Sequence, residues 1–170
     1  MHRLHLLRHA KSSWDDEVDD HERKLNRRGR DEAALVGKHL PTATGPLDLV
    51  LCSTARRARE TMDLVLAGFA PPPRIVIENG IYLADAGKLL NRLARLSESD
   101  EAVLLIGHNP GLRELALTLA APASPRYDVL AGSKFPTAVR ASFKIAGPWA
   151  SLDHSPHELT DYVTVKSFSD

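Results

Sequence analysis

Short apolar runs alternate with amphipathic helical segments along most of the chain, and this alternation limits the possible folds more than any other feature. Strand-like runs lie at 4–7, 47–53, 75–77 and 102–106. The spacing of apolar residues predicts helices over about 26–40, 55–67 and 88–96, and another after Pro110. Strands that alternate with helices are typical of a parallel sheet covered on both faces. We therefore expect a three-layer α/β/α domain with a mainly parallel central sheet.

The C-terminal part of the sequence has a weaker pattern. Residues 121–136 are loop-like, 138–145 alternate as in a half-exposed or edge strand, and the tail from Gly147 is weakly patterned until 162–165. Pro41 is expected just past the end of the first helix. The chain has 170 residues and neither a repeat nor a linker, so we expect a single domain over 1–170.

Composition excludes several classes of protein. Hydrophobic residues make up 43% and charged residues 26%, and the 22 basic side chains balance the 22 acidic ones. This predicts no nucleic-acid or membrane partner and requires that any anion site be a local cluster of charge. The lone Cys52 fits a reducing compartment. Without a long apolar run or a signal-peptide pattern, a cytoplasmic location is expected, while the oligomeric state stays open.

Polar side chains follow three of the predicted strands at the point where each strand ends. Arg8 and His9 follow the first, the segment 53–57 with Arg57 follows the second, and His108 follows the fourth. Ligands of open α/β sheets bind beyond the carboxyl ends of parallel strands. If these strands are neighbours, two histidines and two arginines meet at one place. Guanidinium groups and imidazoles in that arrangement suit a dianionic phosphoryl group.

One of the imidazoles could also form a covalent bond to phosphorus. A neutral histidine nitrogen is a competent nucleophile near neutral pH, and its attack gives a phosphohistidine that water then hydrolyses. The surrounding cations would stabilise the equatorial oxygens of the transition state. This chemistry requires no metal, so we expect no cofactor.

The same segments resemble the signatures of the histidine phosphatase superfamily, formerly the phosphoglycerate mutase family. The motifs are Leu-Arg-His-Ala at 7–10, a segment from Ser53 to Thr61, and Gly-His-Asn-Pro-Gly at 107–111. The short length and the stretch around 7–29 are similar to the SixA-type phosphohistidine phosphatases. The resemblance spans roughly residues 3 to 120. It implies a phosphoglycerate mutase-like fold and a phosphatase with His9 as nucleophile, Arg8 and Arg57 as phosphate clamps, His108 as the second imidazole, and Ser12 near the phosphate.

The sequence departs from the superfamily pattern at two points. Ala10 stands where the commoner motif has glycine, which is acceptable unless the position needs a positive φ. No clear match exists to the acidic general acid of members that cleave phosphate esters; Glu78 and Asp85 are candidates by location only. A phosphorylated imidazole can carry its own proton, whereas an alkoxide leaving group needs an acid. The short connections also predict an open pocket, so we expect phosphohistidine on a partner protein as substrate.

Other functions stay open at this point. One is a broad-specificity phosphatase of small phosphate monoesters that uses Glu78 or Asp85 as acid, and another is a non-catalytic phosphate-binding module. A mutase is disfavoured because it needs a capped pocket. Cys52 does not begin the Cys-(x)5-Arg loop of cysteine phosphatases, because Ala58 occupies the arginine position. The acidic run over 15–20 is interpreted as a solvated loop, or alternatively as a contact for a basic partner.

Overall fold

The computed structural model describes residues 1–154 and 156–168, and its centre is one six-stranded sheet. The strand order is β3-β2-β4-β1-β5-β6. The strands are β1 (His2–Arg8), β2 (Leu49–Ser53), β3 (Arg74–Glu78), β4 (Ala102–Gly107), β5 (Arg140–Ile145) and β6 (Glu158–Val163). The first four strands pair in parallel, whereas β5 runs antiparallel to both of its neighbours, β1 and β6. The sheet is therefore mainly parallel, as expected.

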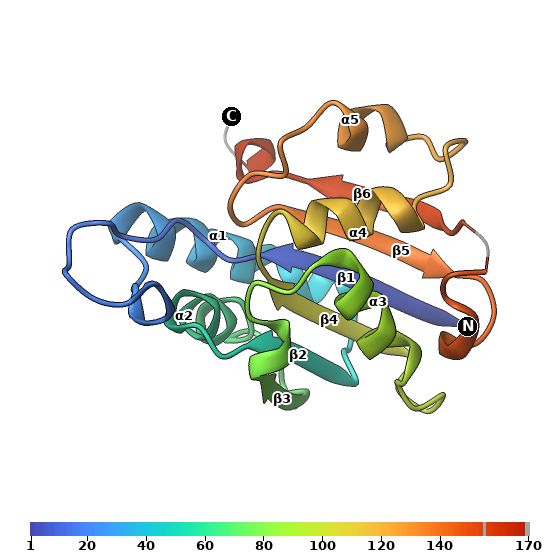
Figure 1. Ribbon diagram of the computed structural model, residues 1–170, viewed down its shortest axis with the longest axis horizontal. Coiled ribbons are helices and arrows are strands. Elements are labelled where there is room, and N and C mark those ends of the chain that lie inside the picture. Colours follow the sequence, from blue (N-terminus) through green and yellow to red (C-terminus); the bar gives the residue numbers. More distant parts are fainter. Residues whose placement is uncertain (155, 169–170) are drawn as a thin grey trace.

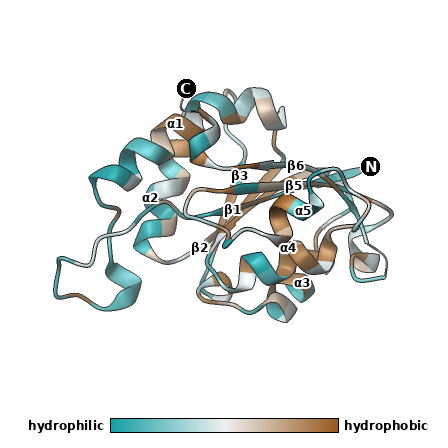
Figure 2. Cartoon of the chain, turned by 90° about the horizontal axis from the view of Figure 1, so that it is seen from above, coloured by the Kyte–Doolittle hydropathy of each residue, from teal (hydrophilic) through white to brown (hydrophobic). Residues whose placement is uncertain are grey.

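Helices cover both faces of the sheet (Figure 2). Two of them, α1 (Arg27–Thr44) and α2 (Arg56–Val65), pack on one face, and α3 (Ala86–Ala94) and α4 (Gly111–Leu119) pack on the other. A short α5 (Tyr127–Ala131) lies on the same face of the sheet as α4 (Figure 1). Each face has its own buried apolar cluster. Short 3-10 helices include η1 (Asp20–Glu22), η2 (Asn79–Ile81), η3 (Trp149–Ser151) and η4 (Val165–Phe168). The three-layer α/β/α architecture is confirmed.

Burial on both faces explains why the inner strands are continuously apolar. Every residue of β2 and β4 is buried, because each strand lies between two others and beneath helices on both sides. In β1, Leu4 and Leu6 face α4, whereas Leu7 faces α1 and α2. None of the described helices is both long and apolar enough to span a membrane.

The first helix runs past the predicted end at Pro41. Proline lacks an N–H group and removes one hydrogen bond of the helix, but α1 continues to Thr44. The amide of Gly45 donates to the carbonyl of Pro41 (3.0 Å), and the hydroxyl of Thr44 donates to the carbonyl of Leu40 (3.1 Å). Leu40 and Thr44 are both buried, so packing of the last turn outweighs the lost bond.

Three predictions for the C-terminal part were wrong. The strand at β5 is not an edge strand; it lies between β1 and β6 and is buried at five of its six positions. The weakly patterned tail contains β6, which starts at Glu158, and the predicted loop over 121–136 contains α5. Antiparallel pairing to β1 is a long-range contact, so local periodicity could not reveal it.

Candidate active site

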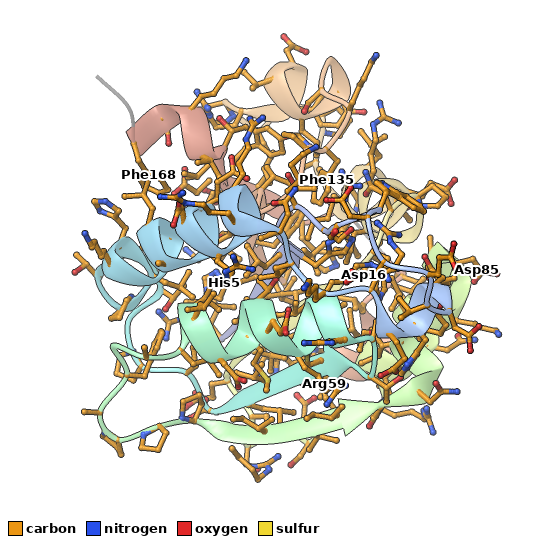
Figure 3. All side chains as sticks on the ribbon, turned by 90° about the vertical axis from the view of Figure 1, so that its left-hand side faces the viewer. His5, Asp16, Arg59, Asp85, Phe135 and Phe168 are labelled. Carbon is orange, nitrogen blue, oxygen red and sulfur yellow. The ribbon has the colours of Figure 1, made fainter. Side chains whose placement is uncertain are left out.

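The three polar clusters meet at the carboxyl end of the sheet, because β2, β4 and β1 are consecutive neighbours. Figure 3 looks onto this end of the molecule. A cavity of about 250 Å³ opens there. Its lining brings together all five residues that the motifs indicated around the phosphoryl group, which are Arg8, His9, Ser12, Arg57 and His108. The other lining residues are Lys11, Trp14, Arg23, Leu83, Asn109 and Thr137.

The backbone and one ring nitrogen fix the orientation of His9. Its amide donates to the carbonyl of Gly107 (3.1 Å), which ties it to the end of β4. Nδ1 lies 2.7 Å from the carbonyl oxygen of Ala10, so Nδ1 carries the proton and donates it. This tautomer leaves the lone pair on Nε2. The imidazole therefore has a defined nucleophilic nitrogen.

Burial keeps His9 in its neutral form. The side chain is only 6% exposed. Burial lowers the pKa of His9 to about 3; the hydrogen bond to Ala10 opposes this shift, and His108, Arg8 and Arg57 reinforce it. A nucleophilic imidazole must be unprotonated, and this environment ensures that state throughout the neutral pH range.

Ala10 fits its position without strain. It is fully buried, its φ is not positive, and its amide donates to the hydroxyl of Thr61 (2.9 Å). Thr61 in turn donates to the carbonyl of Arg57 one turn earlier in α2. The bond joins the segment after β1 to the helix that carries Arg57. The methyl group of Ala10 therefore costs the backbone nothing at this point.

The two arginines approach the cavity from different elements. Nη1 of Arg8 donates to the carbonyl of Phe135 (3.0 Å), whereas its buried Nε has no partner in the described part of the chain. Arg57 is 3% exposed and donates to Asp20 twice, to the backbone oxygen (2.7 Å) and to Oδ2 (3.0 Å). Burial and the nearby Arg57 lower the pKa of Arg8, which shows how closely the cations are gathered.

His108 is the second imidazole of the cavity. Its ring centroid lies 5.1 Å from that of His9, with an angle of 54° between the rings. Nε2 lies 2.8 Å from the hydroxyl of Ser53, while the buried Nδ1 has no hydrogen-bond partner among the described residues. Burial and Arg57 lower the pKa of His108 to about 3, and Asp20 opposes the shift. If Ser53 donates to Nε2, then Nδ1–H is free to donate to a phosphoryl oxygen.

The loop between β1 and α1 contains two residues next to the cavity that the sequence did not indicate as site residues. Asp20 accepts hydrogen bonds from Arg57, from Nη1 of Arg23 (2.9 Å) and from the hydroxyl of Tyr82. Burial raises the pKa of this carboxyl, but the hydrogen bonds from Tyr82, Arg23 and Arg57 outweigh burial and hold it below its usual value. Asp20 is therefore an anion that orients Arg57, and it is not a proton donor.

Arg23 is the other missed residue. It is 8% exposed, lines the cavity, and donates from Nε to the carbonyl of Ser13 (3.0 Å) and from Nη2 to the hydroxyl of Ser12. Its guanidinium carbon lies 3.2 Å from the ring centroid of Trp14, which is 79% exposed. Arg23 lies within the stretch around 7–29 that carries the resemblance, but neither the resemblance nor the surrounding polar residues assigned it a role.

The two candidate general acids lie outside the cavity and have structural contacts. Glu78 accepts three hydrogen bonds from Arg92 at 2.7–3.0 Å, and these hydrogen bonds lower its pKa. Asp85 caps the N-terminus of α3 by accepting from the amide of Lys88 (2.8 Å). Neither residue lines the cavity. The geometry gives no support to either as an acid.

Cys52, Arg56 and His157 have contacts away from the cavity. Cys52 is buried in β2, and burial raises its pKa to about 12. Arg56 is exposed and pairs with Glu60 on α2. His157 is buried and contacts the carbonyl of Leu152 and the amide of Ala146. Within the described ranges, no three His, Cys, Asp or Glu side chains form a group that could hold a metal ion.

Comparison with known proteins agrees with the family resemblance of the sequence. The sequence model described as "Histidine phosphatase superfamily (branch 1)" matches residues 4–92. An uncharacterized protein of Mycobacterium tuberculosis is 36% identical over 149 residues, which cover 86% of this chain and 92% of that protein. The similarity therefore extends well beyond the motifs.

Solved structures with the same architecture cover almost the whole chain. A protein assigned as the phosphohistidine phosphatase SixA of Nakamurella multipartitia superimposes with a TM-score of 0.83 at 26% identity, over 96% of this chain and 95% of that one. A protein assigned as SixA of Agrobacterium tumefaciens superimposes with a TM-score of 0.78 at 27% identity, over 96% of this chain and 98% of that one. The phosphoglycerate mutase-like fold is confirmed.

Proposed function

The chain belongs to the histidine phosphatase superfamily, and on that premise we propose that this phosphatase works through a phosphoryl intermediate on His9 and acts on phosphohistidine of a partner protein. One observation carries the proposal. A buried, neutral imidazole with a free Nε2 lies in a cavity that Arg8, Arg57 and a second imidazole also line. These groups supply a nucleophile and the donors for the phosphoryl oxygens, without a metal.

The first step transfers the phosphoryl group to the enzyme. The lone pair of His9 Nε2 forms a bond to phosphorus while the bond from phosphorus to the substrate nitrogen breaks. The leaving imidazole takes the electron pair of that bond and keeps the proton of its other nitrogen, so it departs as neutral imidazole. His9 gains a positive charge, and the hydrogen bond from Nδ1 to Ala10 stabilises it.

The second step returns His9 to its starting state. Water attacks phosphorus, the bond to Nε2 breaks, and the electron pair returns to the ring. Both protons of the water remain with the product, which leaves as dihydrogen phosphate. In the proposed mechanism, Arg8, Arg57 and His108 bind the equatorial oxygens in both steps.

Among the described residues, none of the carboxylates near the cavity is available as an acid, which supports a phosphohistidine substrate. Within the described residues, the carboxylate bonded to the clamp is Asp20, and its pKa is held low. Glu78 and Asp85 are engaged elsewhere. An alkoxide leaving group would need a proton from the enzyme, whereas an imidazole leaving group does not.

The mouth of the cavity supports a protein substrate. Trp14 and Leu83 line the cavity and are 79% and 55% exposed, so they form an apolar rim. Asp15, Asp16 and Glu17 follow Trp14 on the exposed loop, whose position is marked by Asp16 in Figure 3. Such a rim suits a partner surface with apolar and basic side chains around the phosphorylated histidine.

A substrate panel with an alkaline-quench trap tests the proposal. We expect the enzyme to hydrolyse a phosphohistidine protein with a much higher kcat/KM than p-nitrophenyl phosphate or a sugar phosphate, equally with and without chelator. Brief reaction with labelled phosphohistidine protein should give an acid-labile, base-stable label. His9→Ala should lose both label and turnover.

Matched variants separate the alternatives. Glu78→Gln and Asp85→Asn should leave phosphohistidine turnover nearly unchanged. If either variant abolished ester hydrolysis and esters were the better substrates, the enzyme would be a monoester phosphatase. If phosphate bound with no label and no turnover of any substrate, the chain would be a binding module.

A further inference from the structure

A second cavity of about 440 Å³ lies away from the catalytic one, between the C-terminal end of α1 and the sheet. Alternation along the strands explains its polar lining. Arg3 and His5 occupy the same face of β1 as Leu7, and the register places Lys144 and Ser142 of β5 beside them. Leu7 lies in the core beneath α1 and α2, whereas Arg3 and His5 line the cavity.

Positive charge dominates this cavity. Arg3, Arg140 and Lys144 line it, and Asp161 is the carboxylate among its lining residues. Arg140 is 6% exposed and donates to Asp161 Oδ2 (3.1 Å). Nη1 of Arg3 donates to the carbonyl of Thr44 (3.0 Å), and no described carboxylate lies within ion-pair distance of Arg3 or Lys144. Two of the three cations are therefore available to a ligand.

His5 adds a buried hydrogen-bond donor. It is 4% exposed, and its Nδ1 lies 2.7 Å from the hydroxyl of Ser142. That hydroxyl oxygen also accepts a bond from Arg140, which is a donor only, so Nδ1 is the acceptor that these two contacts offer to the serine hydrogen. The proton of His5 then resides on Nε2, which is buried and has no partner among the described residues. Burial, Arg140 and Arg3 lower the pKa of His5 to about 3, so the ring is neutral at physiological pH.

We propose that this cavity is a second binding site for a small metabolite that bears an oxyanion, a phosphate or a carboxylate. Arg3 and Lys144 line the cavity without a carboxylate partner among the described residues, and both are donors, which is the complement of an acceptor-rich ligand. Its volume falls within the range of about 300–1,000 Å³ that is common for small-molecule sites. The hydroxyl of Thr160 and the carboxylate of Asp161 can accept from hydroxyl groups of the same ligand. The site is separate from the catalytic cavity, with which it shares no lining residue.

Histidine ring NMR of the full chain distinguishes the two sites. Adenosine monophosphate and citrate serve as probes for the phosphate and the carboxylate class. We expect one of them, at millimolar concentration or below, to shift the ring signals of His5. Signals of His9 and His108 report independently on the catalytic cavity.

A charge-matched pair of variants tests the assignment. Arg3→Gln with Lys144→Gln removes two exposed cations of the cavity and should weaken binding at least about tenfold. The control, Arg27→Gln with Lys38→Gln, removes two exposed cations of α1 and should leave binding unchanged. Thermal melts verify that both double variants are folded.

Three results would overturn the assignment. One is the absence of any His5 shift with either probe, and another is equal affinity in the two double variants. The third is a His5 shift that depends on protein concentration without a probe, because a second copy of the chain would then cover the cavity.

Discussion

Replacing His9 should make the stability of the protein less sensitive to acid. The pKa of His9 is lowered to about 3 in the folded state by burial, whereas an unfolded histidine titrates near about 6.5. Between these values the unfolded chain binds one more proton than the folded chain at this residue. The stability that His9 contributes is therefore present at neutral pH and is lost as the pH falls below about 6.5.

The size of this effect follows from the shift. One pKa unit corresponds to about 1.4 kcal/mol, so a change from about pH 7 to about pH 5 should cost roughly 2 kcal/mol through His9 alone. His9→Asn removes this titration, and Asn can still donate to the carbonyl of Ala10. The free energy of unfolding of this variant should therefore fall by about 2 kcal/mol less than that of the wild type over the same interval.

Urea unfolding in phosphate-free buffer at the two pH values measures the difference. Phosphate is left out because a bound anion would raise the pKa of the ring. His154→Asn is the matched control, since it makes the same replacement at an exposed histidine outside the cavity. If His9→Asn kept the full pH dependence of the wild type, His9 would titrate normally in the folded protein, and the argument for a neutral nucleophile would fail.

Three further predictions concern Arg57, Asp20 and Gly29. Arg57→Ala should lower kcat/KM about 10²–10³-fold. Its control is Arg56→Ala, one residue earlier and exposed, which should change kcat/KM about twofold or less. Steady-state kinetics with the same substrate compares the two variants. Asp20→Ala should lower kcat/KM about tenfold or more by freeing Arg57, and Asp20→Asn should recover part of the loss, since an amide can still accept from Arg57. Gly29→Ala should lower Tm by several degrees, because its Cβ would lie 2.0 Å from the carbonyl oxygen of Lys11; Gly80→Ala, with open space around it, should not.

The parallel half of the fold was predictable because its signals are local. Apolar runs bounded by polar residues marked β1, β2, β3 and β4, and helical periodicity marked the crossover helices. The position of the site followed from topology, since side chains after neighbouring parallel strands must meet at one edge. Arg8, His9, Arg57 and His108 were therefore brought together as expected.

The remaining features depend on contacts that are distant in sequence. The interior position of β5 results from its pairing with β1, and the extension of α1 through Pro41 results from packing of its last turn. Asp20 was grouped with a solvated acidic run, but it turns inward to Arg57, which is 37 residues away. No local pattern marks such a residue.

The attachment of His9 has a consequence for how a partner must approach. The residue lies at the tip of an interior strand, its amide is bonded to β4, and its Nδ1 is bonded to its own neighbour. Both bonds would have to break before the ring could move outward. If the substrate is a phosphohistidine protein, as proposed, its phosphorylated side chain must therefore extend into the cavity, so a phosphohistidine on a protruding helix or turn would be a suitable donor and one recessed in a groove would not.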